Sequence, residues 1–105
     1  MFTDDALAEY IRCFTPETIH ASCEDYRAAA SIDLKHDEAD ITSPFTCPVL
    51  VLWGAKGAME RHYDVLPSCR TRARDVSGQA LECGHFMAEE VPEQTLAALK
   101  PFLAG

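Results

Sequence analysis

The sequence has no long hydrophobic run. Its longest apolar stretch, Pro48 to Trp53 (PVLVLW), is far shorter than the roughly 20 residues that a membrane-spanning helix needs. The first ten residues (MFTDDALAEY) are acidic, whereas a signal peptide begins with basic residues. We therefore expect a cytoplasmic protein that has no membrane partner.

Basic residues are scarce as well. The 105 residues include 9 lysines and arginines against 17 aspartates and glutamates, which gives a formal net charge of -8 at pH 7. This balance repels phosphate backbones, and no basic cluster interrupts it. We expect no nucleic-acid partner.

Cysteine and histidine patterns that bind metals are also missing. The five cysteines form no C-x-x-C pair, and the four histidines lie far apart in the chain. We expect reduced thiols, no metal site and no other cofactor.

The first part of the chain has the pattern of amphipathic helices. From Asp4 to Phe14, apolar residues recur at helical spacing, and Thr15-Pro16 then provides an N-cap followed by proline at the first helical position. A second helix is predicted from there through Ala30. The charged stretch 32–41 predicts a further helical turn or two, ending before Pro44.

After Pro44 the pattern changes to alternating strand and helix. The run 48–53 is typical of a strand buried on both faces of a parallel sheet. We predict a loop over 56–62, a crossover helix within 63–76, a second strand at 79–83 and a last helix that opens at Pro92. Two parallel strands cannot bury both of their faces alone, so this unit predicts a piece of a larger fold, or an assembly.

One histidine has a position suited to chemistry. His85 follows the second predicted strand, in Gly84-His85-Phe86, and precedes an acidic loop over 87–90. A histidine on the loop that leaves the carboxyl edge of a sheet can reach the crevice where such sheets bind ligands, and it can serve as a general base. A surface or packing histidine is the alternative.

Longer segments resemble a known family. IHASCEDYRAAASIDLKHDEADI, CPVLVLWGAKG and CGHFMAEEVPEQTLAAL are similar to the C-terminal portion of haloacetate (fluoroacetate) dehalogenases, within the α/β-hydrolase superfamily. The similarity runs from Phe14 almost to the end of the chain. It implies an α/β fold with parallel strands: a helical cap-type segment over 1–43, followed by a βαβα part of the hydrolase core over 44–105.

The resemblance also implies a reaction. In these enzymes an aspartate displaces the halide from carbon and forms an ester, which a water molecule activated by a histidine then hydrolyses. His85 matches that histidine. Tyr26, in EDYR, resembles the cap tyrosine that helps to hold the departing halide, although an ordinary core aromatic is the alternative.

The chain departs from the family at two places. Gly57 stands where many relatives carry the acid that orients the histidine. In haloacetate dehalogenases, which this chain resembles, the orienting aspartate lies one strand earlier, so glycine at position 57 favours that subgroup. The nucleophile belongs to an N-terminal half that this sequence does not contain. We therefore expect the isolated chain to be inactive, and to take a small haloacid only when completed.

Other interpretations stay open at this point. The chain could be a catalytically inactive remnant or an oligomeric structural module, or part of an epoxide hydrolase or esterase. Because a partial sheet leaves an edge and apolar faces uncovered, we expect either a homo-oligomer or a complementing chain.

Overall fold

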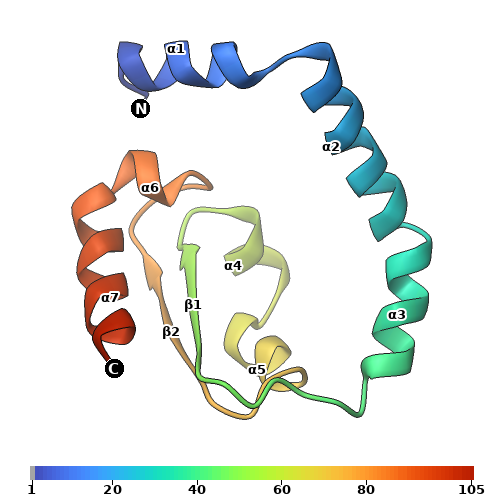
Figure 1. Ribbon diagram of the computed structural model, residues 1–105. Coiled ribbons are helices and arrows are strands. Elements are labelled where there is room, and N and C mark those ends of the chain that lie inside the picture. Colours follow the sequence, from blue (N-terminus) through green and yellow to red (C-terminus); the bar gives the residue numbers. More distant parts are fainter. Residues whose placement is uncertain (1) are drawn as a thin grey trace. The chain divides into compact units, whose positions relative to one another are not determined.

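The computed structural model describes residues 2–105, which divide into two compact units, Phe2–Thr42 and Ser43–Gly105 (Figure 1). The first consists of helices alone and the second combines two strands with helices.

The helical unit contains α1 (Asp4–Cys13), α2 (Pro16–Ala29) and α3 (Ile32–Asp40). Threonine side chains cap the first two helices: Thr3 accepts a hydrogen bond from the backbone N–H of Ala6, and Thr15 accepts one from that of Thr18. Each bond satisfies one of the free N–H groups at a helix start. The helices predicted from periodicity and from Thr15-Pro16 are confirmed.

No residue of α1, α2 or α3 is buried. Ile11 and Phe14, which belong to the apolar stripe of α1, remain 66% and 68% exposed, and Tyr26 on α2 is 79% exposed. Two ion pairs of this unit, Glu9–Arg12 and Glu24–Arg27, lie within single helices. The helical unit therefore has amphipathic helices without a core of its own.

The strand unit is built on two parallel strands, β1 (Val49–Gly54) and β2 (Val76–Leu81). The register pairs Val49 with Val76 and continues without a bulge to Gly54 and Leu81. The first strand was predicted almost as observed. The second begins and ends earlier than the predicted range 79–83, because its pairing with β1 starts as soon as the crossover ends.

The crossover differs from the prediction. Two short helices, α4 (Ala58–His62) and α5 (Val65–Arg70), replace the single helix expected within 63–76, and the expected loop at 56–62 is largely helical. Pro67 lies in the first turn of α5, where its missing N–H would have had no partner within the helix. The proline therefore permits a helix that starts just before it.

Two helices follow β2, namely α6 (Met87–Glu90) and α7 (Pro92–Ala104). The last helix opens at Pro92 as predicted, whereas the acidic segment 87–90 forms one helical turn rather than a loop. In the strand unit, α7 lies on one side of the two strands and α4 and α5 lie on the other (Figure 1). This layering, a parallel βαβα unit with a helix layer on each side, agrees with the predicted fold class.

The core of the strand unit is small. Its buried apolar residues are Ala73, Leu81 and Cys83, and the residues of β1 from Val49 to Trp53 are only half-buried. The prediction of a strand buried on both faces is therefore not met within residues 2–105. Two strands and short helices supply too little cover for that.

Across the part of the chain that the structure describes, no helix is both long and apolar enough to cross a bilayer.

Candidate functional site

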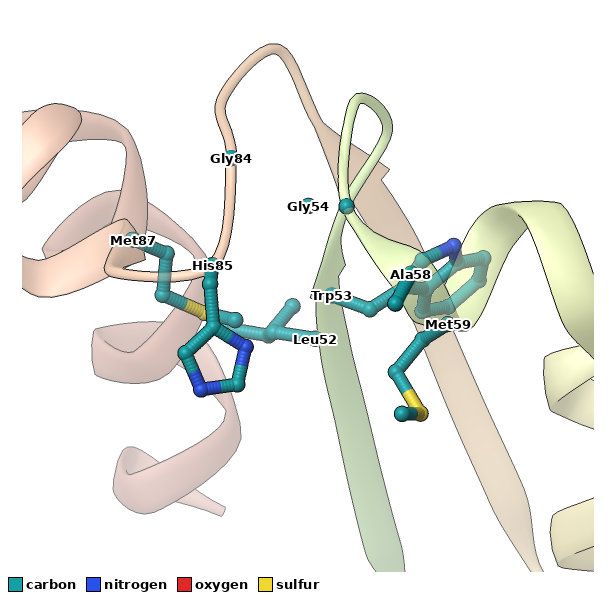
Figure 2. Close-up of a pocket in the computed structure, with 9 residues that line it drawn as sticks. Leu52, Trp53, Gly54, Ala58, Met59, Gly84, His85 and Met87 are labelled. Atoms are coloured by element: carbon teal, nitrogen blue, oxygen red, sulfur yellow. The ribbon is translucent and has the colours of Figure 1, made fainter.

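A pocket of about 180 Å³ lies at the carboxyl end of the two parallel strands. In open α/β sheets this is the edge at which ligands bind. Figure 2 shows its walls: Leu52, Trp53 and Gly54 come from β1, Ala58 and Met59 from α4, and His85 from the loop after β2. Gly57, Gly84 and Met87 complete the lining.

His85 lies in the loop between β2 and α6, and its side chain is exposed. Its imidazole borders the pocket beside Met87 and Leu52 (Figure 2). It also meets the ring of Phe86 edge to face, with 5.0 Å between the ring centroids. The structure thus places His85 at the mouth of a pocket and not inside a closed core. Such an exposed imidazole can exchange a proton with water or a ligand.

Gly54 allows the loops that leave β1 and β2 to touch. A Cβ atom on Gly54 would lie 1.7 Å from the carbonyl oxygen of Gly84 and 2.7 Å from that of Cys83. Both contacts are with backbone, which cannot move aside as a side chain can. Gly54 is therefore needed for the close approach between the end of β1 and the backbone of residues 83–84, which positions the His85 loop.

Hydrogen bonds join the same two loops. The backbone N–H of Ala55 donates to the carbonyl of Leu81 at 2.8 Å, and that of Lys56 donates to the carbonyl of Cys83 at 3.0 Å. These bonds continue the strand pairing beyond the ends of both strands. As a result, the segment before His85 is fixed to the segment that precedes α4.

A carboxylate holds the His85 loop from its other side. Glu90 accepts hydrogen bonds from the backbone N–H of Gly84 at 2.7 Å and from that of Phe86 at 3.2 Å. Sequence reasoning placed Glu90 only in an acidic loop and missed this role. The signal that could have found it is the helical spacing between Phe86, which caps α6, and an acid in the turn that follows.

Cys83 lies close to His85 in sequence but is buried. Burial raises the pKa of its thiol, and the nearby Glu90 carboxylate raises this pKa further. The thiol therefore stays protonated near neutral pH, and a protonated thiol is a poor nucleophile. This argues against Cys83 as a reactive group of the pocket.

The pocket walls are mostly apolar. Leu52, Met59 and Met87 supply aliphatic and thioether surface, and the indole N–H of Trp53 donates to the carboxylate of Glu60 on α4. That bond ties the end of β1 to the first crossover helix. The arrangement suits a small organic ligand held mainly by shape.

No acid is bonded to the imidazole of His85 among residues 2–105. Gly57, which stands where many hydrolases would carry that acid, forms part of the pocket wall. Asp64, an acid seven residues further on, is exposed at the N-terminus of α5 and does not line the pocket. The orienting carboxylate expected from the resemblance is therefore not provided by the described part of this chain.

Tyr26, the second predicted site residue, belongs to the helical unit. Its side chain on α2 is well exposed and packs into no core there, so the alternative of an ordinary core aromatic finds no support within residues 2–42. Its role at a halide site stays a prediction. For the described residues, no cluster of three or more histidine, cysteine or acidic side chains has the geometry of a metal site.

Known proteins resemble this chain over nearly its whole length. A fluoroacetate dehalogenase of Burkholderia sp is 33% identical over 98% of the chain, and a soluble epoxide hydrolase of Corynebacterium sp. (strain C12) is 31% identical over 99%. A crystal structure of a candidate α/β-hydrolase from Nostoc sp PCC 7120 superposes with a TM-score of 0.93, at 63% identity over 97% of the chain. The chain carries part of an α/β-hydrolase fold.

The matched share of these relatives is small. The chain spans 34% of the fluoroacetate dehalogenase, 35% of the epoxide hydrolase and 35% of the Nostoc protein. No protein-family model matches it. The predicted resemblance to the C-terminal portion of a haloacetate dehalogenase, within the α/β-hydrolases, is confirmed.

Proposed function

We propose that this chain supplies the water-activating histidine, His85, and one wall of the substrate pocket of an α/β-hydrolase that acts on a haloacid. The observation that carries the proposal is the position of His85. Its exposed imidazole borders a pocket at the carboxyl edge of a parallel sheet, and its loop is fixed by backbone hydrogen bonds on one side and by the Glu90 carboxylate on the other.

The proposed reaction has two steps. A carboxylate oxygen of an aspartate outside this chain attacks the carbon that bears the halogen, the carbon–halogen bond breaks, and the halide leaves with the bonding electrons. His85 then takes a proton from a water molecule, whose oxygen attacks the ester carbonyl. The ester C–O bond breaks and the protonated His85 gives its proton to the leaving oxygen, which releases the hydroxy acid and restores both the aspartate and the neutral histidine.

Two groups of the chain would assist these steps. The apolar walls formed by Leu52, Met59 and Met87 would exclude bulk water from the reacting carbon. Tyr26 would donate a hydrogen bond from its phenolic O–H to the departing halide. The carboxylate that orients His85 would come from the strand that precedes β1 in the complete sheet, consistent with glycine at position 57.

Epoxide hydrolysis is the second candidate function. The soluble epoxide hydrolase of Corynebacterium matches the chain almost as well as the dehalogenase does. An ester formed by opening an epoxide would require the same water-activating histidine. Gly57 favours the dehalogenase, because most epoxide hydrolases would be expected to carry an acid there.

The test is to trap the ester. The protein is purified from its native source together with any chain that accompanies it, and a His85→Asn variant of the same assembly is incubated with fluoroacetate or with a small epoxide. We expect the variant to accumulate a covalent adduct on the nucleophile, measured by intact mass, and to release fluoride at least about 100-fold more slowly in steady state.

The substrate that forms the adduct decides between the two functions. An adduct from fluoroacetate alone supports the dehalogenase, and an adduct from the epoxide alone supports the second candidate. Full turnover of both substrates by the variant would refute a role for His85 in water activation. A Cys69→Ser variant, changed on α5 away from the pocket lining, serves as the matched control.

A further inference from the structure

The segment that carries His85 is held by a side chain that has no place in the proposed reaction. Glu90 directs its carboxylate back across the loop, and both oxygens are used: Oε2 accepts from the N–H of Gly84 and Oε1 accepts from the N–H of Phe86. These two amides belong to the residues on either side of His85. The histidine is thus bracketed by one carboxylate.

A backbone hydrogen bond also joins Glu90 to this loop. The bracket is the pair of hydrogen bonds from the N–H groups of Gly84 and Phe86 to the Glu90 carboxylate. The N–H of Glu90 donates to the carbonyl of Phe86 at 2.8 Å, while the side chain of Glu90 accepts from the N–H of Phe86. This reciprocal pair resembles a capping box, in which an acid in the first turn bonds back to the residue that caps the helix. The additional bond to Gly84 reaches beyond the cap to the far side of His85.

The Glu90 carboxylate lies directly against Gly84. A Cβ atom there would lie 2.9 Å from Oε1 and 3.2 Å from Oε2 of Glu90. The carboxylate is therefore seated directly against the loop backbone and not separated from it by solvent. Hydrogen bonds from backbone N–H groups to an ionised carboxylate are stronger than bonds between neutral groups.

We propose that Glu90 is a positioning residue for His85. By fixing the amides before and after the histidine, it sets the backbone direction from which the imidazole enters the pocket, without touching the imidazole or the substrate. This inference rests on the proposed function for its consequence in the reaction, whereas the two hydrogen bonds can be tested without any substrate.

The experiment compares Glu90→Gln with Glu93→Gln in the complete ¹⁵N-labelled chain. Glutamine keeps the size of glutamate but presents an amide NH₂ to one of the two N–H donors, so at least one bond is lost. Glu93 lies in the first turn of α7, and its replacement makes the same charge change outside the bracket. Amide hydrogen exchange and the Cε1–H resonance of His85 are measured in all three proteins.

We expect the amides of Gly84 and Phe86 to exchange roughly tenfold faster in Glu90→Gln than in the wild type, and to be unchanged in Glu93→Gln. The His85 resonance should shift or broaden in the first variant alone. The strand amides of Leu50 and Gly78 report in the same spectra that the sheet is intact.

Three results would overturn the inference. The first is exchange at Gly84 and Phe86 within about twofold of wild type in Glu90→Gln. The second is loss of protection at Val91, whose N–H bonds to Met87 within the α6 turn, with an unmoved His85 resonance; Glu90 would then be only a helix cap. The third is a wild-type chain with unprotected strand amides, since the bracket requires the sheet.

A failure of the proposed function would look different. If His85→Asn left hydrolysis unchanged while the amide results came out as expected, Glu90 would still position His85 but the histidine would not activate water. If the amides did not respond while His85→Asn trapped the ester, the reaction would stand without this positioning residue.

Discussion

The ion pairs of the helical unit, Phe2–Thr42, join residues within single helices, whereas the strand unit, Ser43–Gly105, is held by pairing between segments far apart in the chain. Side-chain caps and ion pairs three residues apart are among the bonds that stabilise α1 and α2. In the strand unit, β1 pairs along its full length with β2, and the loops beyond both strands are joined as well.

This difference indicates that the exposed apolar surface of each unit has to be covered by residues outside that unit. Short helices without tertiary packing are marginal in water, so the exposed apolar stripe of α1 requires a surface outside its own unit. The strand unit has a small core but leaves β1 half-buried. Both observations agree with a chain that corresponds to about a third of its relatives.

The largest effect should come from Gly54→Ala. Because the added Cβ would overlap the carbonyl oxygen of Gly84, we expect the strand unit to lose at least about 3 kcal/mol of stability. Urea unfolding followed by Trp53 fluorescence measures the loss. Gly57→Ala is the control: its Cβ would lie 3.1 Å from the carbonyl oxygen of Gly54, so a cost of about 1 kcal/mol or less is expected. Equal losses would contradict the close-approach role of Gly54.

The next largest effect is a difference in amide hydrogen exchange between the two units of the same chain. Amides of β1 and β2 should exchange at least about tenfold more slowly than those of α1, α2 and α3, because only the strands are protected by bonds between distant segments. Hydrogen exchange of the intact chain measures both sets together. Equal protection would mean that the helices are covered as well as the strands are, for example by a second copy of the chain.

A smaller effect is expected from the helix caps. Thr15→Ala removes the acceptor for the N–H of Thr18 and should cost about 1 kcal/mol of local helix stability in α2. Circular dichroism and exchange at the α2 amides measure it. Thr3→Ala should act in the same way on α1, and neither change should alter the strand amides. A response of the strands to either variant would show that the two units are coupled.

The smallest effect concerns pH. The hydrogen bond from Arg12 holds the pKa of the Glu9 carboxyl below its ordinary value of 4.5. A lowered folded-state pKa stabilises α1 above the ordinary value, and this contribution is lost as the pH falls through the lowered pKa. Helical circular dichroism should therefore decline below about pH 4.5, and less so in Glu9→Gln. An identical decline in both proteins would assign the change to other groups.

Much of the fold could be predicted from local signals. Thr15-Pro16 fixes the start of α2, and the apolar run before Gly54 fixes β1, because capping, proline geometry and β-branched residues act within a few positions. The bounds of β2 and of the crossover helices could not be predicted in this way. They depend on pairing with β1 and on Pro67 being tolerated in a first helical turn, which are properties of the assembled unit.

In the candidate site, too, residues marked by a local sequence pattern could be predicted, and contacts that depend on the folded unit could not. His85 could be predicted because Gly-His after a strand is a local pattern supported by a long resemblance. Glu90 could be predicted only as an acid at helical spacing from Phe86, because its second bond, to the N–H of Gly84, depends on the loop turning back toward α6. Tyr26 remains a prediction, since its environment is not supplied by the helical unit.

The central claim is that His85 works in a pocket that this chain only partly builds. The most direct test measures fluoride release from fluoroacetate by the purified 105-residue chain, alone and with a hydrolase segment that carries the aspartate nucleophile. We expect no release by the chain alone. Addition of the segment should give release, which His85→Ala should abolish. Release by the chain alone, or unchanged release by the completed His85→Ala protein, would contradict it.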